Sequence, residues 1–388
     1  MINPADFYRQ LAREGFSYFT GVPDSLLKEF CAYVTDTVDA RDHVITANEG
    51  GAVALATGYH LATGKAGVVY MQNSGLGNAV NPLLSLADPE VYSIPILLLV
   101  GWRGEPGVKD EPQHRKQGRV QNAILQAMEI PYEVLSGDAD TAATQLRTLT
   151  EHMREHSCPV ALVVRKGTFE PYDPSGNVDN ESTDTAIAPG RTYPMNRETA
   201  LQMILGALSP EDRIVSTTGK TSREIYEIRE ARREDHSRDF LTVGSMGHAV
   251  MIALGLAEHQ SRTVYCIDGD GAVLMHLGSL AIAGNRDAEN LRHIVINNGA
   301  HESVGGQPTV GYDIAFERIA SELGYRAFIR AETEEELGLS LERLSSERGP
   351  VLLEVRVEPG SRSDLGRPST TPLENKSSLM EGLGVVPE

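Results

Sequence analysis

Short apolar runs rich in β-branched residues alternate with helix-length amphipathic segments along most of the chain. Such alternation is typical of parallel sheets with helices on both faces, because parallel strands are buried on both sides and need long crossover connections. The runs expected to form strands lie at 17–20, 44–46, 68–71, 96–100 and 160–164, near 214, and at 264–267, 293–296 and 351–357. The pattern therefore predicts the α/β class.

The first helix is predicted in detail. Asn3 is a suitable N-cap, and Pro4 suits the first helical position. Phe7 and Leu11 then share one face, and Gly15 is expected to end the helix.

The length of 388 residues suggests two domains of roughly 100–200 residues each. Residues 171–194 are rich in Pro, Gly, Ser, Asp and Thr and have no apolar periodicity, so they are the predicted linker. We expect two domains at 1–170 and 195–357, each a mostly parallel sheet flanked by helices, with no middle domain and a C-terminal tail at 358–388. The halves share no sequence repeat.

The charge balance limits the possible partners. With 35 Lys+Arg against 54 Asp+Glu, the net charge is −19, which argues against a nucleic acid or an anionic membrane as partner. The sequence starts without the features of a signal peptide and has no apolar run of membrane-spanning length, so a cytoplasmic location is expected. The three cysteines, Cys31, Cys158 and Cys266, form no CxxC pair and suggest buried thiols rather than a zinc site.

The strongest motif is Gly269-Asp270-Gly271, which follows the predicted strand at 264–267. A second strand then ends at Asn297-Asn298, after the 25 intervening residues 272–296. Carboxylate and amide oxygens at the carboxyl ends of parallel strands suit Mg²⁺, and glycines allow close approach of a phosphate. A tight turn and a strand-end cap are the structural alternatives for these residues.

This pair of motifs resembles the cofactor-binding motif of the thiamin-diphosphate-dependent enzymes. The resemblance implies that thiamin diphosphate is bound with Mg²⁺, and that the Asp270 and Asn298 side chains and the Ala300 carbonyl ligate the metal. It also implies that Gly271 and Ala272 lie under the diphosphate.

The same resemblance assigns three further residues. Glu49, at a strand-to-helix junction, is expected to hydrogen-bond the pyrimidine ring of the cofactor and to serve in catalysis, although a Glu in a first helical turn is also common for its effect on the helix dipole. Gly244 is expected to receive the aminopyrimidine and Met246 to bend the cofactor. A core position is the alternative for Met246.

A loop at 217–222 also follows a predicted strand and opens a helix. Thr218 and Gly219 are therefore candidates for contact with the diphosphate. Gly219-Lys220-Thr221 copies the end of a nucleotide-binding P-loop, but position 214 is Ile where that motif needs Gly, so a nucleotide-binding protein is disfavoured.

The segments at 21–25, 297–309 and 364–368 resemble those of the decarboxylases that act on phosphonopyruvate and sulfopyruvate. The Asn-Asn-Gly-Ala-His sequence at 297–301 and the single continuous chain favour the phosphonopyruvate enzymes. The resemblance implies decarboxylation of 3-phosphonopyruvate to phosphonoacetaldehyde and CO₂ in phosphonate biosynthesis. A sulfopyruvate decarboxylase and a carboligase acting on a 2-oxo acid remain the alternatives.

The segment at 102–119, which is expected to form a loop after the strand at 96–100, holds five Lys and Arg residues against three acids, which is unusual in a chain of charge −19. Arg and Lys hold phosphonate groups by charge-assisted hydrogen bonds, so an anionic substrate is expected here. A solvated loop of mixed charge is the alternative. The candidate substrate residues, within this segment and outside it, are Ser25, Arg103, Lys109, Arg115, Ser303 and Gln307.

Asp24, His114 and His301 are the candidates for proton transfer, since histidine titrates near neutral pH. A buried structural role is the alternative for either histidine. The resemblance implies that Glu49 and Asp270 act from different subunits, so a homo-oligomer with active sites at the subunit interface is expected.

Overall fold

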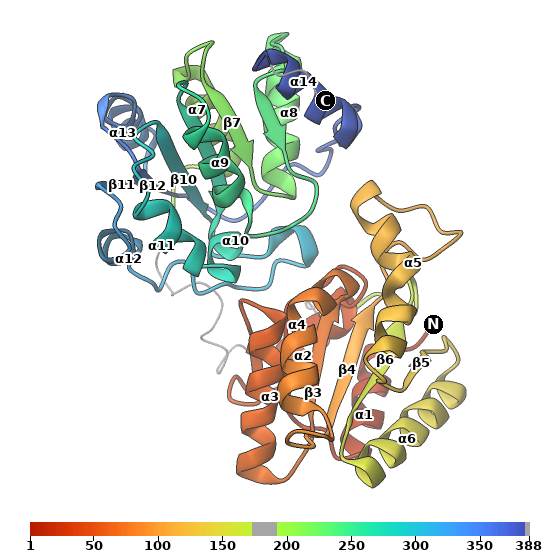
Figure 1. The fold of residues 1–388 in the computed structure, drawn as a ribbon. Coiled ribbons are helices and arrows are strands. Elements are labelled where there is room, and N and C mark those ends of the chain that lie inside the picture. The colour runs from red at the N-terminus through yellow and green to blue at the C-terminus, as the bar shows by residue number, and fades with distance from the viewer. Residues whose placement is uncertain (173–191, 385–388) are drawn as a thin grey trace. The chain divides into compact units, whose positions relative to one another are not determined.

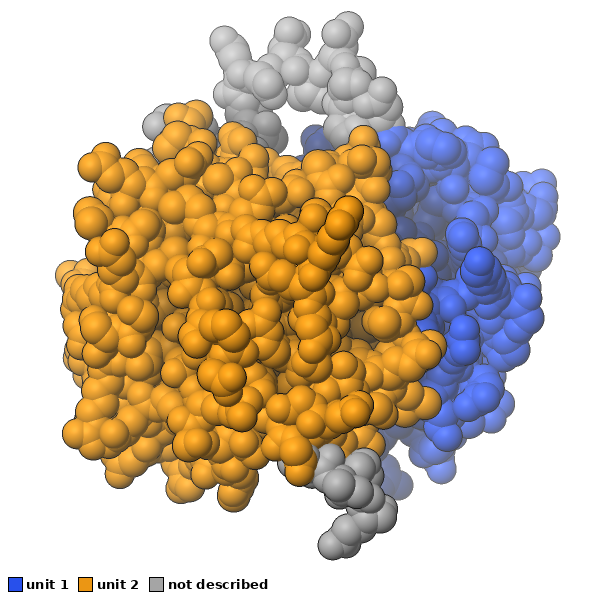
Figure 2. Space-filling model, turned by 90° about the horizontal axis from the view of Figure 1, so that it is seen from above, with its two compact units in different colours: residues 1–185, 304–307 blue, residues 186–303, 308–388 orange. Residues whose placement is uncertain are grey.

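The computed structural model describes residues 1–172 and 192–384, which fall into two compact units (Figures 1 and 2). The first unit comprises residues 1–185 with 304–307, and the second comprises 186–303 with 308–388. Residues 173–191, which include most of the predicted linker, and 385–388 lie outside the described residues.

The first unit contains a six-stranded sheet in the order β2-β1-β3-β4-β6-β5, in which every pair is parallel. Its strands are β1 (Phe19–Gly21), β2 (His43–Ile45), β3 (Gly67–Gln72), β4 (Ile96–Gly101), β5 (Tyr132–Val134) and β6 (Pro159–Val164). Its helices and short helical turns are α1 (Pro4–Arg13), α2 (Lys28–Thr37), α3 (Glu49–Thr63), η1 (Asn73–Gly75), α4 (Leu76–Pro82), η2 (Leu83–Ala87), α5 (Pro112–Ala127) and α6 (Ala139–His156).

Two apolar clusters fill the two faces of this sheet. Along β4, Leu97 and Leu99 belong to one cluster and Leu98 and Val100 to the other, as the two-residue period of a strand requires. Burial on both faces explains why the strand reads as a continuous apolar run in the sequence. The predicted first helix is confirmed: the Asn3 side chain accepts a hydrogen bond from the backbone N–H two residues on, and the helix starts at Pro4.

The second unit contains another six-stranded parallel sheet, in the order β11-β12-β10-β9-β7-β8. Its strands are β7 (Arg213–Ser216), β8 (Asp239–Leu241), β9 (Val264–Gly269), β10 (Leu291–Asn297), β11 (Ala327–Ala331) and β12 (Val351–Arg356). Its helices are α7 (Arg197–Ala207), α8 (Lys220–Arg232), α9 (Ala249–Glu258), α10 (Asp270–Met275), α11 (Gly278–Gly284), α12 (Phe316–Glu322), α13 (Glu334–Ser346) and α14 (Pro372–Gly382), with the turn η3 (Glu302–Val304).

The two sheets have the same topology. When the strands of each unit are numbered from its own first strand, both sheets have the order 2-1-3-4-6-5. The predicted α/β class, with two sheets flanked by helices, is confirmed. The two units share an architecture without a detectable sequence repeat.

Three strands were not predicted, and all three lie at sheet edges. β5, β8 and β11 are three to five residues long and partly exposed, so they lack the apolar run that marks a central strand. The predicted loop at 102–119 is wrong in its second half, because residues from Pro112 onward form α5. The C-terminal segment includes α14, whose Asn375 amide donates to the Asp239 carbonyl at 2.8 Å.

Among residues 1–172 and 192–384, no helix has both the length and the apolar content that crossing a bilayer requires.

Candidate cofactor site

Asp270 and Asn298 follow the carboxyl ends of two neighbouring strands in the second unit. β9 ends at Gly269 and α10 begins at Asp270, while Asn298 comes directly after β10. The two strands pair in register, with Ile296 opposite Gly269. Parallel pairing therefore brings both polar side chains to the same edge of the sheet, where ligands of α/β proteins commonly bind.

The Asp270 carboxylate is buried, and burial raises its pKa to about 6. The Thr309 hydroxyl and the Asn298 backbone N–H both donate hydrogen bonds to it. Within the described part of the chain, no Lys, Arg or His forms an ion pair with this carboxylate. A buried carboxylate with neutral donors and no cationic side chain suits a metal ion, which supplies the missing positive charge.

The two asparagines after β10 have different roles. The Asn297 amide nitrogen donates to the Gly311 carbonyl and to Glu354 Oε1, both at 2.8 Å, so this side chain fixes the loop. Among the described residues, Asn298 Oδ1 accepts only the Ala300 N–H, at 3.2 Å, which leaves a second lone pair for a ligand. A carboxylate, an amide oxygen and the nearby Ala300 carbonyl form a donor set that fits Mg²⁺.

The loop at 244–247 lies against the first turns of α10. A side chain at Gly247 would place its Cβ 2.9 Å from the Ala272 carbonyl oxygen, so the two segments are in close contact. Ser245 has a positive φ of 55°, a strained conformation that is concentrated at functional sites. Met246 is half-buried and belongs to no core cluster, so the core alternative for Met246 is not supported.

His301 and Ser303 lie beside two of the candidate glycines. The ring of His301 lies 3.0 Å from where a Cβ on Gly271 would be, and Ser303 Oγ lies 2.7 Å from the corresponding position on Gly219. Gly219 has a φ of 99° and precedes α8, and Thr218 beside it is half-buried. The structure thus gathers these candidate residues at one edge of the second sheet.

Glu49 begins α3 in the first unit and is 5% exposed. Its Oε2 accepts a hydrogen bond of 2.7 Å from the Asn78 amide on α4. Its Oε1 lies 2.4 Å from where a Cβ on Gly75 would be, so only glycine allows the carboxylate its position. Burial raises the pKa of Glu49, and the Asn78 hydrogen bond opposes that rise.

Asp24 and His114 are also buried in the first unit. Asp24 Oδ2 accepts the Leu26 N–H at 3.0 Å, Oδ1 has no partner among the described residues, and burial raises the pKa of this carboxyl to about 6. Burial lowers the pKa of His114 to about 4, with a further contribution from Arg103, and burial alone lowers that of His301 to about 4. The expectation that these histidines titrate near neutral pH is therefore wrong, because both rings are desolvated.

Among the described residues, Arg103 is the one substrate candidate at 102–119 whose charged group is fixed by hydrogen bonds to other side chains. It forms a bidentate ion pair with Asp110, with distances of 2.8 and 2.5 Å, and donates to Ser25 Oγ at 2.8 Å. Lys109 and Arg115 are exposed. Gln307 is buried with its Oε1 unpartnered among the described residues.

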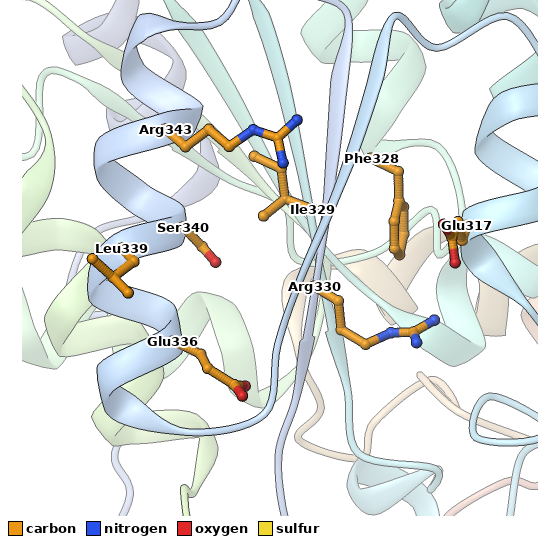
Figure 3. Close-up of a pocket in the computed structure, with 8 residues that line it drawn as sticks. All are labelled: Glu317, Phe328, Ile329, Arg330, Glu336, Leu339, Ser340 and Arg343. Carbon is orange, nitrogen blue, oxygen red and sulfur yellow. The ribbon is translucent and has the colours of Figure 1, made fainter.

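A groove of about 460 Å³ lies on the second unit between α13 and the edge strand β11 (Figure 3). None of the candidate residues lines it. Its two arginines are already engaged, since Arg330 pairs with Glu354 at 2.8 Å and Arg343 with Glu347 at 3.0 Å. We therefore do not assign the active site to this groove.

Three residues that the sequence did not single out support the candidate side chains. Asn78 holds Glu49, Thr309 holds Asp270, and Asp110 holds Arg103. Each is a short polar residue on a loop or a helix whose partner lies 7 to 39 positions away. No sequence spacing predicts these three contacts. The glycines on either side of Leu76 do indicate a close backbone approach just before Asn78.

Comparisons with known proteins identify the two domains. The family described as thiamine pyrophosphate enzyme, N-terminal TPP binding domain, matches residues 5–129, and its C-terminal TPP binding domain matches residues 217–355. Thiamine pyrophosphate is another name for thiamin diphosphate. Each of the two sheets therefore belongs to a domain that is typical of thiamin diphosphate enzymes.

Full-length relatives narrow the class. A phosphonopyruvate decarboxylase of Streptomyces viridochromogenes is 34% identical over 96% of this chain and 93% of its own length, and one of Streptomyces hygroscopicus is 34% identical over 96% and 92%. A sulfopyruvate decarboxylase of Methanosarcina acetivorans is 25% identical over 93% of each chain. The chain belongs to the phosphonopyruvate decarboxylase family of thiamin diphosphate enzymes.

Proposed function

We propose that this chain decarboxylates 3-phosphonopyruvate to phosphonoacetaldehyde and CO₂ with thiamin diphosphate and Mg²⁺. The main support is the buried Asp270 carboxylate, which follows β9 beside Asn298 and has no cationic side-chain partner within the described residues. A metal site with one carboxylate and neutral oxygen ligands at the carboxyl ends of parallel strands suits a diphosphate cofactor with its cation.

The cofactor would be held through its metal and its diphosphate. Asp270, Asn298 and the Ala300 carbonyl would supply oxygen ligands to Mg²⁺, and Gly271 with Ala272 would face the diphosphate at the start of α10. The 244–247 loop lies beside Ala272 and would receive the aminopyrimidine. Thiamin diphosphate supplies a carbon nucleophile and an electron sink, and the protein binds and orients it.

Glu49 would hold the pyrimidine ring through a charge-assisted hydrogen bond. Glu49 would donate its proton to N1′ of the ring and then, as a carboxylate, accept the hydrogen bond from N1′–H, whereas burial favours the neutral carboxyl. The amide of Asn78 donates to one oxygen, which stabilises the ionised form and leaves the other oxygen for the cofactor. A buried and oriented carboxylate of this kind can move a proton without reorganising solvent.

The substrate carries a phosphonate and a carboxylate, and Arg103 is the basic group in the first unit best placed to bind one of them. Its bidentate ion pair with Asp110 fixes the guanidinium before the substrate arrives, which lowers the entropic cost of binding. Asp24 would return the proton to the product carbon, because a carboxyl with a pKa of about 6 can take up and release a proton near neutral pH. His114 and His301 would act as neutral hydrogen-bonding groups.

We also propose a homo-oligomer in which Glu49 acts on cofactor held by Asp270 of the partner subunit. Apolar side chains that the single chain leaves in solvent support it. Leu61, on the helix that starts with Glu49, is 74% exposed, and Ile282 on α11 is 53% exposed. Apolar helix faces left uncovered in one chain are typical of subunit interfaces.

The substrate assignment is tested by comparing kcat/KM for phosphonopyruvate, sulfopyruvate and pyruvate through CO₂ release. We expect phosphonopyruvate to be preferred, and the Arg103→Lys variant to lose more activity with it than with pyruvate, because a point charge replaces a bidentate donor. A preference for sulfopyruvate would overturn the substrate, and a condensation product formed with an added aldehyde would indicate a carboligase.

A further inference from the structure

A buried cluster of three potential metal ligands lies between the central strands of the second sheet. Cys266 and Asp268 are two positions apart on β9, and His293 is the register partner of Cys266 on β10. Side chains with these relations project from the same face of a parallel sheet. Their ligand atoms all lie within 4.8 Å of one another, and all three residues are fully buried.

Two of these atoms have no hydrogen-bond partner among the described residues. They are Asp268 Oδ2 and His293 Nε2, which lie 3.8 Å apart, too far for a direct hydrogen bond. A buried carboxylate oxygen without a partner has lost its hydration without a replacing hydrogen bond. The cluster therefore carries a desolvation cost that nothing in the described chain offsets.

The other polar atom of each residue is engaged. Asp268 Oδ1 accepts the Gly269 N–H at 3.0 Å, and His293 Nδ1 is hydrogen-bonded to the Tyr325 hydroxyl at 2.9 Å. Anchoring one ring nitrogen of a histidine on a second residue fixes the orientation of the other nitrogen, as outer partners of metal-bound histidines do. The unpartnered atoms thus have fixed orientations beside the Cys266 sulfur.

We propose that Cys266, Asp268 and His293 bind a zinc ion at a site separate from the Mg²⁺ site. A thiolate, a carboxylate and a neutral imidazole are common zinc ligands, and their charges sum with Zn²⁺ to zero, as a fully buried site requires. Tetrahedral zinc with Zn–O and Zn–N bonds of about 2.0–2.2 Å places those two ligand atoms roughly 3.3–3.5 Å apart, within a few tenths of an ångström of the 3.8 Å between Asp268 Oδ2 and His293 Nε2.

Binding replaces the thiol proton of Cys266, and that proton goes to solvent. The soft sulfur selects zinc against magnesium, which prefers oxygen ligands. The metal would join β9 to β10 immediately before Asp270 and Asn298. The spacing of cysteines in the sequence cannot indicate such a site, because its ligands come from two strands and include only one cysteine.

The test uses metal analysis of the full chain, purified without chelator and supplied with Mg²⁺. We expect about one zinc per chain in the wild-type protein and in the control Cys158→Ser, whose cysteine is buried in the first unit. The Cys266→Ser variant is expected to lose most of the zinc, with Mg²⁺-dependent cofactor binding retained. Equal zinc content in the two variants would overturn the proposal.

A second measurement uses the wild-type chain alone and does not depend on a variant that folds. Metal-stripped protein titrated with Co²⁺ is expected to develop the visible bands of a tetrahedral site and a thiolate-to-cobalt charge-transfer band, both displaced by zinc. Zinc is also expected to raise the Tm of the stripped protein. Absence of the thiolate band would overturn the proposal, and neither readout depends on decarboxylase activity.

Discussion

Removing the Asn78 amide tests how the protein keeps a buried Glu49 ionised. In Asn78→Ala, Oε2 loses its 2.7 Å hydrogen bond while Glu49 stays 5% exposed or close to it. A hydrogen bond to a charged group contributes about 1.5–3 kcal/mol, and each 1.4 kcal/mol corresponds to a tenfold change. The neutral form of Glu49 therefore gains about ten- to 150-fold over the ionised form.

The assay is the pH dependence of kcat/KM. Loss of a donor to the carboxylate raises the Glu49 pKa, so the acidic limb of the profile is expected to move to higher pH. Below that limb, kcat/KM falls by about the same ten- to 150-fold factor, and well above it the variant approaches the wild-type rate. A merely structural effect would lower the whole profile without moving its limb.

Asn81→Ala is the matched control. Asn81 lies on the same helix, is exposed, and has its hydrogen bond with Ser85 rather than with Glu49. Its profile is expected to coincide with that of the wild type. An unmoved acidic limb in Asn78→Ala would refute the reasoning, as would equal shifts in both variants.

Three further outcomes are expected. Gly75→Ala places a Cβ 2.4 Å from Glu49 Oε1, so steady-state assays should show a large loss of kcat, and unchanged kinetics would contradict the close approach. Burial raises the pKa of Asp24 from 3.8 to about 6 in the folded protein, because the neutral carboxyl is favoured there. The contribution of Asp24 to the free energy of unfolding is therefore complete below pH ~4 and is lost as the pH rises through 6. Asp24→Asn, which keeps the hydrogen bond to the backbone, should therefore be more stable than wild type by up to ~3 kcal/mol at pH 8 but not at pH 4, and thermal melts showing the same difference at both values would contradict this. Leu61→Glu should dissociate the oligomer in sedimentation experiments and abolish turnover. Leu339 on α13 is also a leucine and is 63% exposed, and the control Leu339→Glu should have neither effect. An oligomer unchanged by Leu61→Glu would exclude α3 from the interface.

Most of the fold could be predicted because central parallel strands are buried on both faces. The apolar runs of β3, β4, β6, β9 and β10 stand out in the sequence for that reason. Edge strands such as β5 have one side in solvent and no such run, so they were missed. The identical order of the two sheets arises from long-range pairing, which local sequence patterns do not encode.

Only those residues of the candidate site that lie in short sequence motifs could be predicted. Gly269-Asp270-Gly271 and Asn297-Asn298 mark strand ends, and strand ends of a parallel sheet share an edge. Asn297 and Asn298 have different roles because Asn297 is hydrogen-bonded to Glu354. Glu354 lies 57 positions away, so the short motif does not distinguish the two asparagines. The low pKa of His114 depends on burial, which a residue type alone does not reveal.

Phosphorus NMR of phosphonopyruvate incubated with the protein tests the proposed activity most directly. Phosphonoacetaldehyde is expected to appear only when thiamin diphosphate and Mg²⁺ are both present, and its rate of formation is expected to fall sharply in Glu49→Gln. Product formed without the cofactor, product formed at the wild-type rate by Glu49→Gln, or no product under any condition would contradict the proposed function.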